Sequence, residues 1–330
     1  MKLAGERVLV TGAGGFIGSH LTELLVRRGA SVRAMVHYNS RGEWGHLSAL
    51  PPEALEQVEV LPLDVTDPYA VDGAAQGCSA IFHLAALIGI PYSYAAPASY
   101  VDVNVKGTQH VLEAARRHGV RCVVHTSTSE VYGTARYTPI DEAHPLQAQS
   151  PYSASKIAAD KLAESYQRSF GLPVVTLRPF NTYGPRQSAR AVIPTIIAQL
   201  AQGARSVRLG SLKPIRDFTF VTDTARAFVA MAEADLRPGT LCNAGSGAGI
   251  SIGDLARRIV SAMGASAEIV SEDQRVRPDE SEVMELVAGA GAIREHTGWT
   301  PEVTLDQGLE RAIEYVREHL DSYKATIYNV

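Results

Sequence analysis

Hydrophobic and polar positions follow two alternating patterns through roughly the first half of the chain. Short continuous apolar runs are typical of strands buried on both faces of a parallel sheet, whereas apolar residues recurring every three or four positions are typical of helices. The runs that predict strands are 7–10, 31–36, 58–61, 80–83, 120–125 and 174–177. The helical stretches between them include 17–28, 100–118 and 152–170, each followed closely by a glycine. This alternation predicts an α/β fold with a doubly wound parallel sheet covered by helices on both faces.

The second part of the chain has a less regular pattern. Helical spacing recurs at 192–201, 224–234, 255–263 and 305–319, and short strands are expected near Val207, Phe218 and Ile269. These elements predict a smaller mixed α/β lobe. We therefore expect a first domain at 1–183 with a return of the chain at about 217–246, and a C-terminal lobe built from 184–216 and 247–330. The pattern leaves 321–330 open between a loose tail and a docking strand.

Composition narrows the classes of protein to which the chain belongs. The 330 residues include 31 Lys and Arg against 35 Asp and Glu, a formal net charge of −4, with 45% hydrophobic and 20% charged residues. These values argue against intrinsic disorder and against a general nucleic-acid-binding surface. Cys78, Cys122 and Cys242 are widely spaced, so we expect no disulfide framework, no bound metal and a reducing, cytoplasmic location. The longest apolar run, 80–90, is too short to span a membrane, and no membrane partner is expected.

A glycine-rich turn joins the first predicted strand to the first predicted helix. Its sequence, TGAGGFIG, places Gly12, Gly15 and Gly18 between these elements, with Phe16 and Ile17 opening the helix. Gly12 permits a tight turn, Gly15 lets the backbone approach a pyrophosphate, and Gly18 lets the helix pack closely on the strand. The helix N-terminus offers free N–H groups to the anion. The turn therefore predicts a Rossmann-type dinucleotide site formed by these five residues.

The expected ribose-binding acid is missing. In NAD-binding folds an Asp or Glu follows the second strand, which here places it near Val36 and His37, and neither is acidic. Arg33 and Arg41 lie nearby in the sequence and would favour a 2′-phosphate, although each is equally explained as a solvated surface charge. The cofactor is therefore NAD or NADP, with NAD as the working expectation.

A tyrosine and a lysine share one face of the helix at 152–170. Tyr152 and Lys156 stand four residues apart, which places them on the same side of a helix. A lysine ammonium near a phenol favours the phenolate, so Tyr152 can act as a base near neutral pH.

A cluster of hydroxyls and a carboxylate leaves the end of the fifth strand, where open α/β sheets bind their ligands. If the extended geometry continues, Thr128 and Glu130 point the same way because they are two residues apart. The threonine hydroxyl can hold a substrate oxygen, and the carboxylate can remove a proton from carbon. Glu130 is alternatively a surface or helix-capping acid.

Together these motifs resemble the extended short-chain dehydrogenase/reductases, in particular their NAD(P)-dependent nucleotide-sugar epimerase/dehydratase branch. The resemblance covers nearly the whole chain and implies a Rossmann-type domain with a substrate lobe. Its further motifs are Asp64-Val65, His83-Leu84-Ala85-Ala86, Asn104-Val-Lys-Gly107, Arg178-Pro-Phe-Asn-Thr-Tyr-Gly-Pro-Arg186 and Arg216-Asp-Phe-Thr-Phe-Val221.

The resemblance also assigns roles to individual residues. It implies that Thr128, Glu130, Tyr152 and Lys156 are catalytic, and that Lys156 also holds the nicotinamide ribose. The implied cofactor contacts beyond the glycine turn are Asp64, Val65, Leu84, Ala85, Ala86, Tyr152 and Lys156. The implied substrate contacts are Asn181, Arg186, Arg216 and Arg277. A homodimer through a four-helix bundle is implied for 100–118 and 151–170, using Val103, Val111, Ala158 and Leu162, which would equally well face the sheet.

Within this branch, several stretches are similar to nucleotide-sugar 4,6-dehydratases. Thr-Ser-Glu at 128–130 is similar to GDP-mannose 4,6-dehydratases and UDP-glucuronate decarboxylases, with Ser129 in place of the aspartate of dTDP-glucose 4,6-dehydratases. The stretches 37–40, 90–94, 187–194 and 277–282 look closer to UDP/GDP-N-acetylglucosamine 4,6-dehydratases of legionaminic-acid-type pathways. The implied reaction converts an NDP-hexose to its 4-keto-6-deoxy form through transient C4 oxidation by a tightly bound NAD(P)⁺ that is regenerated each turnover.

Three alternatives stay open at this point. A UDP-glucuronate decarboxylase and an NDP-sugar 4-epimerase share the first oxidation, but a 4-epimerase has no evident need for a carboxylate at C5. A non-catalytic NAD(P)-sensing protein would be marked by loss of Tyr152 or Lys156, and both are present. The nucleotide, the sugar and the acid that protonates the leaving water are not predicted.

Overall fold

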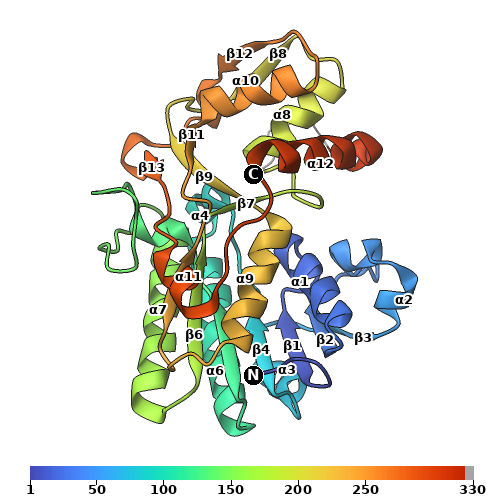
Figure 1. Ribbon diagram of the computed structural model, residues 1–330, viewed down its shortest axis with the longest axis vertical. Coiled ribbons are helices and arrows are strands. Elements are labelled where there is room, and N and C mark those ends of the chain that lie inside the picture. Colours follow the sequence, from blue (N-terminus) through green and yellow to red (C-terminus); the bar gives the residue numbers. More distant parts are fainter. Residues whose placement is uncertain (324–330) are drawn as a thin grey trace.

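The computed structural model describes residues 1–323, and its largest element is a seven-stranded parallel sheet (Figure 1). The strand order is β10-β6-β5-β4-β1-β2-β3, and every neighbouring pair is parallel. The strands are β1 (Arg7–Thr11), β2 (Ser31–Val36), β3 (Val58–Pro62), β4 (Ala80–His83), β5 (Cys122–Thr126), β6 (Val174–Pro179) and β10 (Leu241–Ala244). The order reverses between β1 and β4, and such a reversal opens a ligand-binding crevice at the carboxyl ends of the strands.

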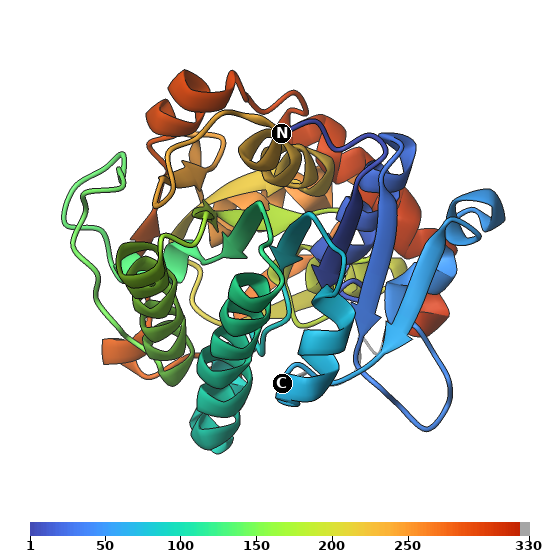
Figure 2. The same ribbon diagram turned by 90° about the horizontal axis from the view of Figure 1, so that it is seen from below.

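Helices cover both faces of this sheet, as the second view shows (Figure 2). One face carries α1 (Phe16–Arg27), α9 (Val221–Glu233) and α11 (Gly291–Thr297), which share one hydrophobic core with the strands. The other carries α3 (Pro68–Ala75), α6 (Gly107–Arg117) and α7 (Pro151–Phe170), which share a second core. The predicted doubly wound, Rossmann-type architecture is confirmed.

A smaller mixed α/β lobe with its own core lies above the sheet in Figure 1. It holds a four-stranded sheet of β7 (Asn181–Tyr183), β9 (Ile215–Phe220), β11 (Gly249–Ser251) and β13 (Glu285–Leu286), and a β8–β12 pair (Ser206–Leu209, Glu268–Ser271). Its helices are α8 (Val192–Ala201), α10 (Ile252–Ala262) and α12 (Leu305–Glu318). The remaining short helices are α2 (Pro52–Leu55), α4 (Ile90–Ala95) and α5 (Pro97–Tyr100). Within residues 1–323, no helix combines the length and apolar character needed to cross a membrane.

The chain passes between the sheet layer and the lobe at different points from those expected. Residues 217–220 belong to β9 of the lobe sheet, whereas α9 and β10 join the sheet layer. Residues 291–299, expected in the lobe, pack on the sheet layer through Ile293 and Trp299. The strands β7, β11 and β13 were not predicted because each is only two or three residues long, too short to show a period. The strand β10 was not predicted because Asn243 interrupts its apolar run.

The helix expected at 100–118 is interrupted by a π-helical segment, Val101–Lys106, between α5 and α6. Asn104 lies in this segment and is buried. Its side chain accepts from the backbone N–H of Leu87 at 2.8 Å and donates to the carbonyl of Leu87 and the hydroxyl of Ser155, both at 2.9 Å. Single π turns inside helices often mark functional sites. Asn104 thus ties the loop after β4 to α7.

Candidate active site

The glycine turn between β1 and α1 leaves its backbone open to a ligand. Gly12 has a φ of +70°, and a Cβ on Gly18 would overlap the carbonyl oxygen of Gly12, so α1 packs directly on the turn. Gly15 is the N-cap residue of α1, and no side chain of residues 1–323 caps this end. Phe16 and Ile17, the first residues of the helix, pack against the core of the lobe. Uncapped N–H groups and the positive end of the helix dipole fit a dinucleotide pyrophosphate.

Replacing Gly18 with alanine is expected to push α1 away from the turn. The added methyl group overlaps backbone that cannot rotate aside, and we expect a loss of about 3 kcal/mol in the free energy of unfolding together with loss of bound NAD(P). Thermal unfolding and the nucleotide content of the purified protein measure both effects. Gly73→Ala in α3 is the matched control, because a Cβ there meets nothing within 4 Å among the described residues. Wild-type stability and nucleotide content in Gly18→Ala would contradict this packing argument.

The segment 37–46, after β2, folds back onto the glycine turn. The backbone N–H of His46 donates to the carbonyl of Gly14 at 2.9 Å. Gly45 has a φ of +60°, and a Cβ on it would overlap that same carbonyl. The side chain of Asn39 closes the segment, because its Oδ1 accepts the backbone N–H groups of Arg41 and Glu43, two and four residues further along. The segment therefore forms a wall beside the turn, at the carboxyl end of β2.

An acidic residue does stand at this edge, but it follows β3 instead of β2. Asp64 Oδ2 lies 3.7 Å from Nδ1 of His37, and its Oδ1 accepts both the N–H and the hydroxyl of Thr66 at 2.8 Å. Val65 is buried, and its methyl groups face Gly107 at the start of α6. The Asp64-Val65 pair is thus anchored next to the exposed imidazole of His37.

Of the two arginines considered for a 2′-phosphate, one is already engaged. Arg33 donates to Glu59 at 2.8 Å and to three backbone carbonyls at the end of α3. Arg41 is exposed, and its nearest carboxylate is Glu43 at 4.0 Å. Arg33 therefore gives no support to a preference for NADP.

A buried histidine holds the loop after β4 against the glycine turn. His83 Nδ1 shares a hydrogen bond with the Thr11 hydroxyl at 2.8 Å, and its Nε2 contacts the Thr108 hydroxyl at 3.0 Å. Thr11 Oγ1 also accepts the backbone N–H groups of the first two loop residues at 3.1 Å. A Cβ on Gly12 would lie 2.8 Å from this loop backbone. The predicted cofactor residues of the loop are Leu84, Ala85 and Ala86, and all three are half-buried.

The start of α7 places the predicted tyrosine and lysine. Ser150 and Ser153 form a capping box that begins the helix, so Tyr152 and Lys156 lie one turn apart in its first two turns. Both side chains are buried. Lys156 Nζ donates to the carbonyl of Thr126, at the end of β5, at 2.7 Å. The end of β5 and the start of α7 are therefore held together at the site.

Thr128 and Glu130 both act on the Tyr152 phenol, although the backbone that carries them differs from the extended one expected. Thr128 is extended, but Ser129–Tyr132 form a 3₁₀ turn that Thr128 caps by accepting the N–H of Glu130 at 3.2 Å. The alternation assumed from the sequence therefore ends at Thr128. The Thr128 hydroxyl nevertheless interacts with the Tyr152 phenol, and the charge of Glu130 acts on the same phenol.

The side chains around Tyr152 favour its neutral form. Burial raises the pKa of Tyr152, the hydroxyl of Thr128 lowers it, and the negative charge of Glu130 raises it further. Burial also lowers the pKa of Lys156 to about 8, against the effect of Asp160. In residues 1–323 alone, burial therefore keeps the pKa of Tyr152 above its ordinary value, and the role of Lys156 in forming the phenolate stays a prediction. The pKa of Tyr152 must fall when cofactor and substrate bind if this group is to act as a base.

Two of the predicted substrate arginines converge on one carboxylate. Arg216, on β9, is buried, and its Nη2 lies 3.5 Å from Glu282 Oε1. Arg277 Nη1 lies 3.6 Å from the same oxygen, and this buried nitrogen has no hydrogen-bond partner among residues 1–323. Burial lowers the pKa of Arg216, and the charge of Glu130 raises it; the same charge acts on Tyr152. The arrangement fits an anionic group next to the catalytic side chains.

The other two predicted substrate residues differ from each other. Asn181, the first residue of β7, has a buried Oδ1 without a partner among the described residues, as expected of a group that awaits a ligand. Arg186 instead pairs with Glu23 of α1 at 2.9 Å and does not share Glu282 with the other arginines. Its guanidinium is thus engaged on α1, and its backbone has a φ of +68°.

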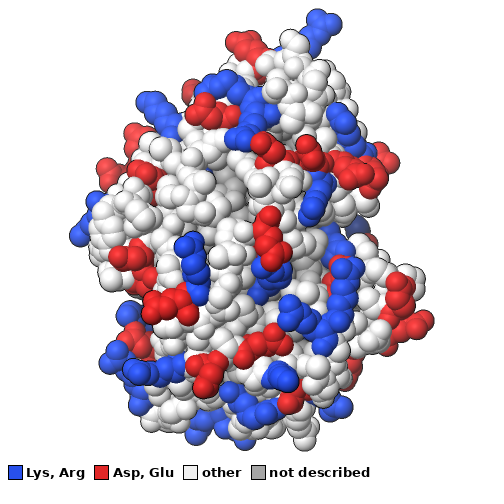
Figure 3. Space-filling view, viewed as in Figure 1, with Lys and Arg blue, Asp and Glu red and all other residues white. Residues whose placement is uncertain are grey.

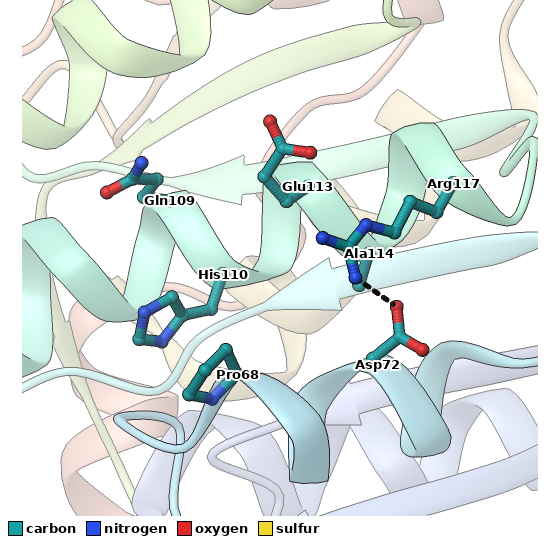
Figure 4. A pocket seen from close by; sticks show the side chains of 7 residues that line it. All are labelled: Pro68, Asp72, Gln109, His110, Glu113, Ala114 and Arg117. Atoms are coloured by element: carbon teal, nitrogen blue, oxygen red, sulfur yellow. Dashed lines mark ion pairs between the residues drawn. The ribbon is translucent and has the colours of Figure 1, made fainter.

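Basic and acidic side chains are interspersed on the face of the molecule that Figure 3 shows. A separate pocket between α3 and α6 holds an Arg117–Asp72 ion pair at 3.6 Å and none of the predicted site residues (Figure 4). Its lining residues are Pro68, Asp72, Gln109, His110, Glu113, Ala114 and Arg117.

Comparison with known proteins places this site in a family. A family model described as GDP-mannose 4,6 dehydratase matches residues 9–312. The chain belongs to the GDP-mannose 4,6-dehydratase family. The family is NAD(P)-dependent, and its members among the relatives are nucleotide-sugar dehydratases and epimerases.

Individual relatives of the family cover nearly the whole chain. A dTDP-glucose 4,6-dehydratase from Streptomyces antibioticus is 32% identical over 318 residues, covering 94% of this chain and 92% of the relative. A UDP-glucose 4-epimerase from Mycolicibacterium smegmatis is 33% identical over 323 residues, covering 94% and 98%. A crystal structure of dTDP-glucose 4,6-dehydratase from Streptomyces venezuelae, solved with NAD bound, has a TM-score of 0.84 at 29% identity and covers 96% of this chain and 99% of that one.

The sequence analysis missed two charged residues at this site. Glu282 bridges the arginines, and Asp160 lies one turn beyond Lys156 on α7. The position of Asp160 could have been predicted, because it follows Lys156 by four residues, the spacing that also separates Lys156 from Tyr152. Glu282 lies in an irregular segment, where no period predicts the direction of a side chain.

Proposed function

We propose that this protein is a nucleotide-sugar 4,6-dehydratase that converts an NDP-hexose to the NDP-4-keto-6-deoxy sugar. The observation that carries the proposal is the carboxylate of Glu130, whose negative charge raises the pKa of Tyr152, the phenol with which the Thr128 hydroxyl also interacts. A carboxylate at this place has a task in elimination, because a proton must be removed from C5. In a 4-epimerase no such proton is removed.

The chain's own residues have separate tasks in this reaction. Tyr152, as phenolate, takes the proton of the sugar 4-hydroxyl while Thr128 holds the same oxygen. The 4-ketone makes the C5 proton acidic, and Glu130 removes it. Water then leaves C6, with Glu130 or a group near Ser129 as the acid. NAD or NADP, held by the glycine turn, Asp64-Val65 and Lys156, supplies the acceptor for the C4 hydride and the donor that returns it to C6.

The two arginines support a substrate that carries a diphosphate. Arg216 and Arg277 share the single carboxylate of Glu282, and Nη1 of Arg277 has no hydrogen-bond partner among residues 1–323. Arg216 is buried, so its interaction with an anion is little screened. We propose N-acetylglucosamine as the sugar, because the stretches 37–40, 90–94, 187–194 and 277–282 are similar to dehydratases of that substrate. Two of these stretches touch, through Tyr94 Oη and Ser281 Oγ at 2.6 Å.

A panel of UDP-, GDP- and dTDP-sugars, each incubated with the purified protein and analysed by mass spectrometry, tests the proposal. We expect a product lighter by one water, from UDP- or GDP-N-acetylglucosamine. Loss of carbon dioxide from UDP-glucuronate would instead make the protein a decarboxylase. An isomer of unchanged mass would make it a 4-epimerase, the activity of the Mycolicibacterium smegmatis relative, and would leave Glu130 without its role.

We further propose that two chains pair through α6, α7 and the segment before α6. Val103, Ala158 and Leu162 are only half-buried, which leaves apolar surface for a partner. Val111 is fully buried in the core between the helices and the sheet, so it takes no part in such a contact. Sedimentation equilibrium measures the expected dimer.

A further inference from the structure

The active site rests on a buried carboxylate that has no assigned task. Asp160 on α7 is 7% exposed, and its carboxylate makes four hydrogen bonds. It accepts from His125 Nε2 at 3.1 Å and Ser127 Oγ at 2.7 Å, both at the end of β5. It also accepts from Arg178 on β6, through Nη2 at 2.9 Å and Nε at 3.3 Å. Hydrogen bonds to charged groups are stronger than neutral ones, so this cluster is held rigidly.

These bonds place Asp160 between the two halves of the catalytic machinery. His125 and Ser127 flank Thr126, the residue whose carbonyl receives Lys156 Nζ. Thr128, whose hydroxyl interacts with the Tyr152 phenol, follows Ser127 in the chain. The Asp160 carboxylate thus fixes the position of the end of β5 relative to α7, the helix that carries Tyr152 and Lys156.

The same carboxylate is the nearby source of negative charge for Lys156. The two residues are one helical turn apart, and the charge of Asp160 opposes the effect of burial on the pKa of Lys156, which is about 8. Burial lowers the pKa values of His83, on β4, and His125, on β5, and the charge of Lys156 lowers both further. On β6, Arg178 is cationic and pairs with Asp160.

We propose that Asp160 is a positioning residue, which clamps the end of β5 to α7 and keeps Lys156 protonated during turnover. The inference rests on the proposed nucleotide-sugar chemistry, but only on the C4 oxidation that dehydratases, decarboxylases and 4-epimerases share. Asp160 touches neither substrate nor cofactor in this scheme.

The sign of the expected pH effect follows from the charges. Without the Asp160 charge, the pKa of Lys156 falls further below about 8, so the ammonium is lost at lower pH. Any activity that needs the Lys156 ammonium then declines at a lower pH than in the wild-type enzyme. We expect the alkaline limb of the rate profile of Asp160→Asn to move toward neutral pH by about one unit or more.

The test measures C4 oxidation from neutral to alkaline pH, as the absorbance of reduced nicotinamide after mixing holoenzyme with its NDP-sugar. Two control variants keep the negative charge: Asp160→Glu replaces the carboxylate by another, and Ser127→Ala removes only one of its hydrogen bonds. In both, the alkaline limb of the pH–rate profile should stay where it is in the wild-type enzyme. A uniform loss at every pH in Asp160→Asn, without a shift, would overturn the proposal. So would an equal shift in Ser127→Ala.

A second variant covers the case in which Asp160→Asn does not fold. Removing one partner of a buried ion pair leaves the other unpaired and is strongly destabilising, whereas removing both is often tolerated. Asp160→Asn/Arg178→Met removes both. Asp160 is the charge that acts on Lys156, so the alkaline limb should still move in the same direction. An unmoved limb in a folded double variant would also contradict the proposal. Failure of dehydration alone, with C4 oxidation intact, would overturn only the proposed function.

Discussion

The Tyr152→Phe enzyme is expected to lose about a hundredfold or more in kcat, with little change in stability. The phenol oxygen is the group that exchanges a proton with the sugar 4-hydroxyl, and acid–base catalysis by one positioned side chain contributes on this scale. The ring packs with Tyr100, at 6.2 Å between centroids, and phenylalanine keeps that contact. Steady-state turnover of the NDP-sugar and thermal unfolding measure the two quantities.

A second tyrosine on the same helix provides the control. Tyr166 is buried, and its hydroxyl donates to Glu113 on α6 at 2.8 Å, far along α7 from Lys156. Tyr166→Phe should keep nearly full turnover and lose only the hydrogen bond, worth about 1 kcal/mol. Near-normal turnover in Tyr152→Phe would remove the phenolate from the mechanism.

The Glu130→Gln enzyme is expected to stop after the first step. The amide keeps the size of the side chain and cannot take the C5 proton, so C4 oxidation continues while elimination falls by about a hundredfold or more. The loss of negative charge also removes one cause of the raised pKa of Tyr152, which favours the first step. Reduced nicotinamide should therefore accumulate when the NDP-sugar is added.

Isotope exchange separates this outcome from a general loss of activity. In deuterated water, wild-type protein should place deuterium at C5 of the product, because C6 receives the hydride that left C4, whereas Glu130→Gln should exchange nothing. Glu285→Gln, on β13, is a control of the same chemistry away from Tyr152, and it should behave as wild type. Full dehydratase turnover by Glu130→Gln would refute its assignment as the base.

Long, strongly patterned elements could be predicted from the sequence, and short ones could not. Strands such as β2 and helices such as α8 begin and end where the period predicts, because burial on one or both faces dictates every position. The π-helical segment was not predicted because the helical spacing of apolar residues continues through it without a break. The segment depends instead on tertiary contacts, since Asn104 hydrogen-bonds to the loop after β4 and to α7.

The same distinction holds for the candidate site. The glycine turn and the Tyr152–Lys156 pair follow from local geometry, since one is a strand-to-helix turn and the other a helical repeat. The place of Arg186 depends on Glu23, which is 163 residues away in the chain. The ionisation of Tyr152 depends on burial and on charges from β5 and α7, which no local spacing reveals.

The contact between segment 37–46 and the glycine turn limits how the coenzyme preference of this protein could be re-engineered. Swapping NAD and NADP usage in a Rossmann enzyme requires new side chains after the second strand, where His37 stands. Gly45 cannot join such a redesign, because any side chain on it would strike the carbonyl of Gly14. Substitutions are therefore tolerated in the outer part of the segment, at His37, Tyr38, Ser40 and Arg41, while Asn39 and the return to the turn must stay unchanged. A library built on this protein should randomise the former and leave the latter untouched.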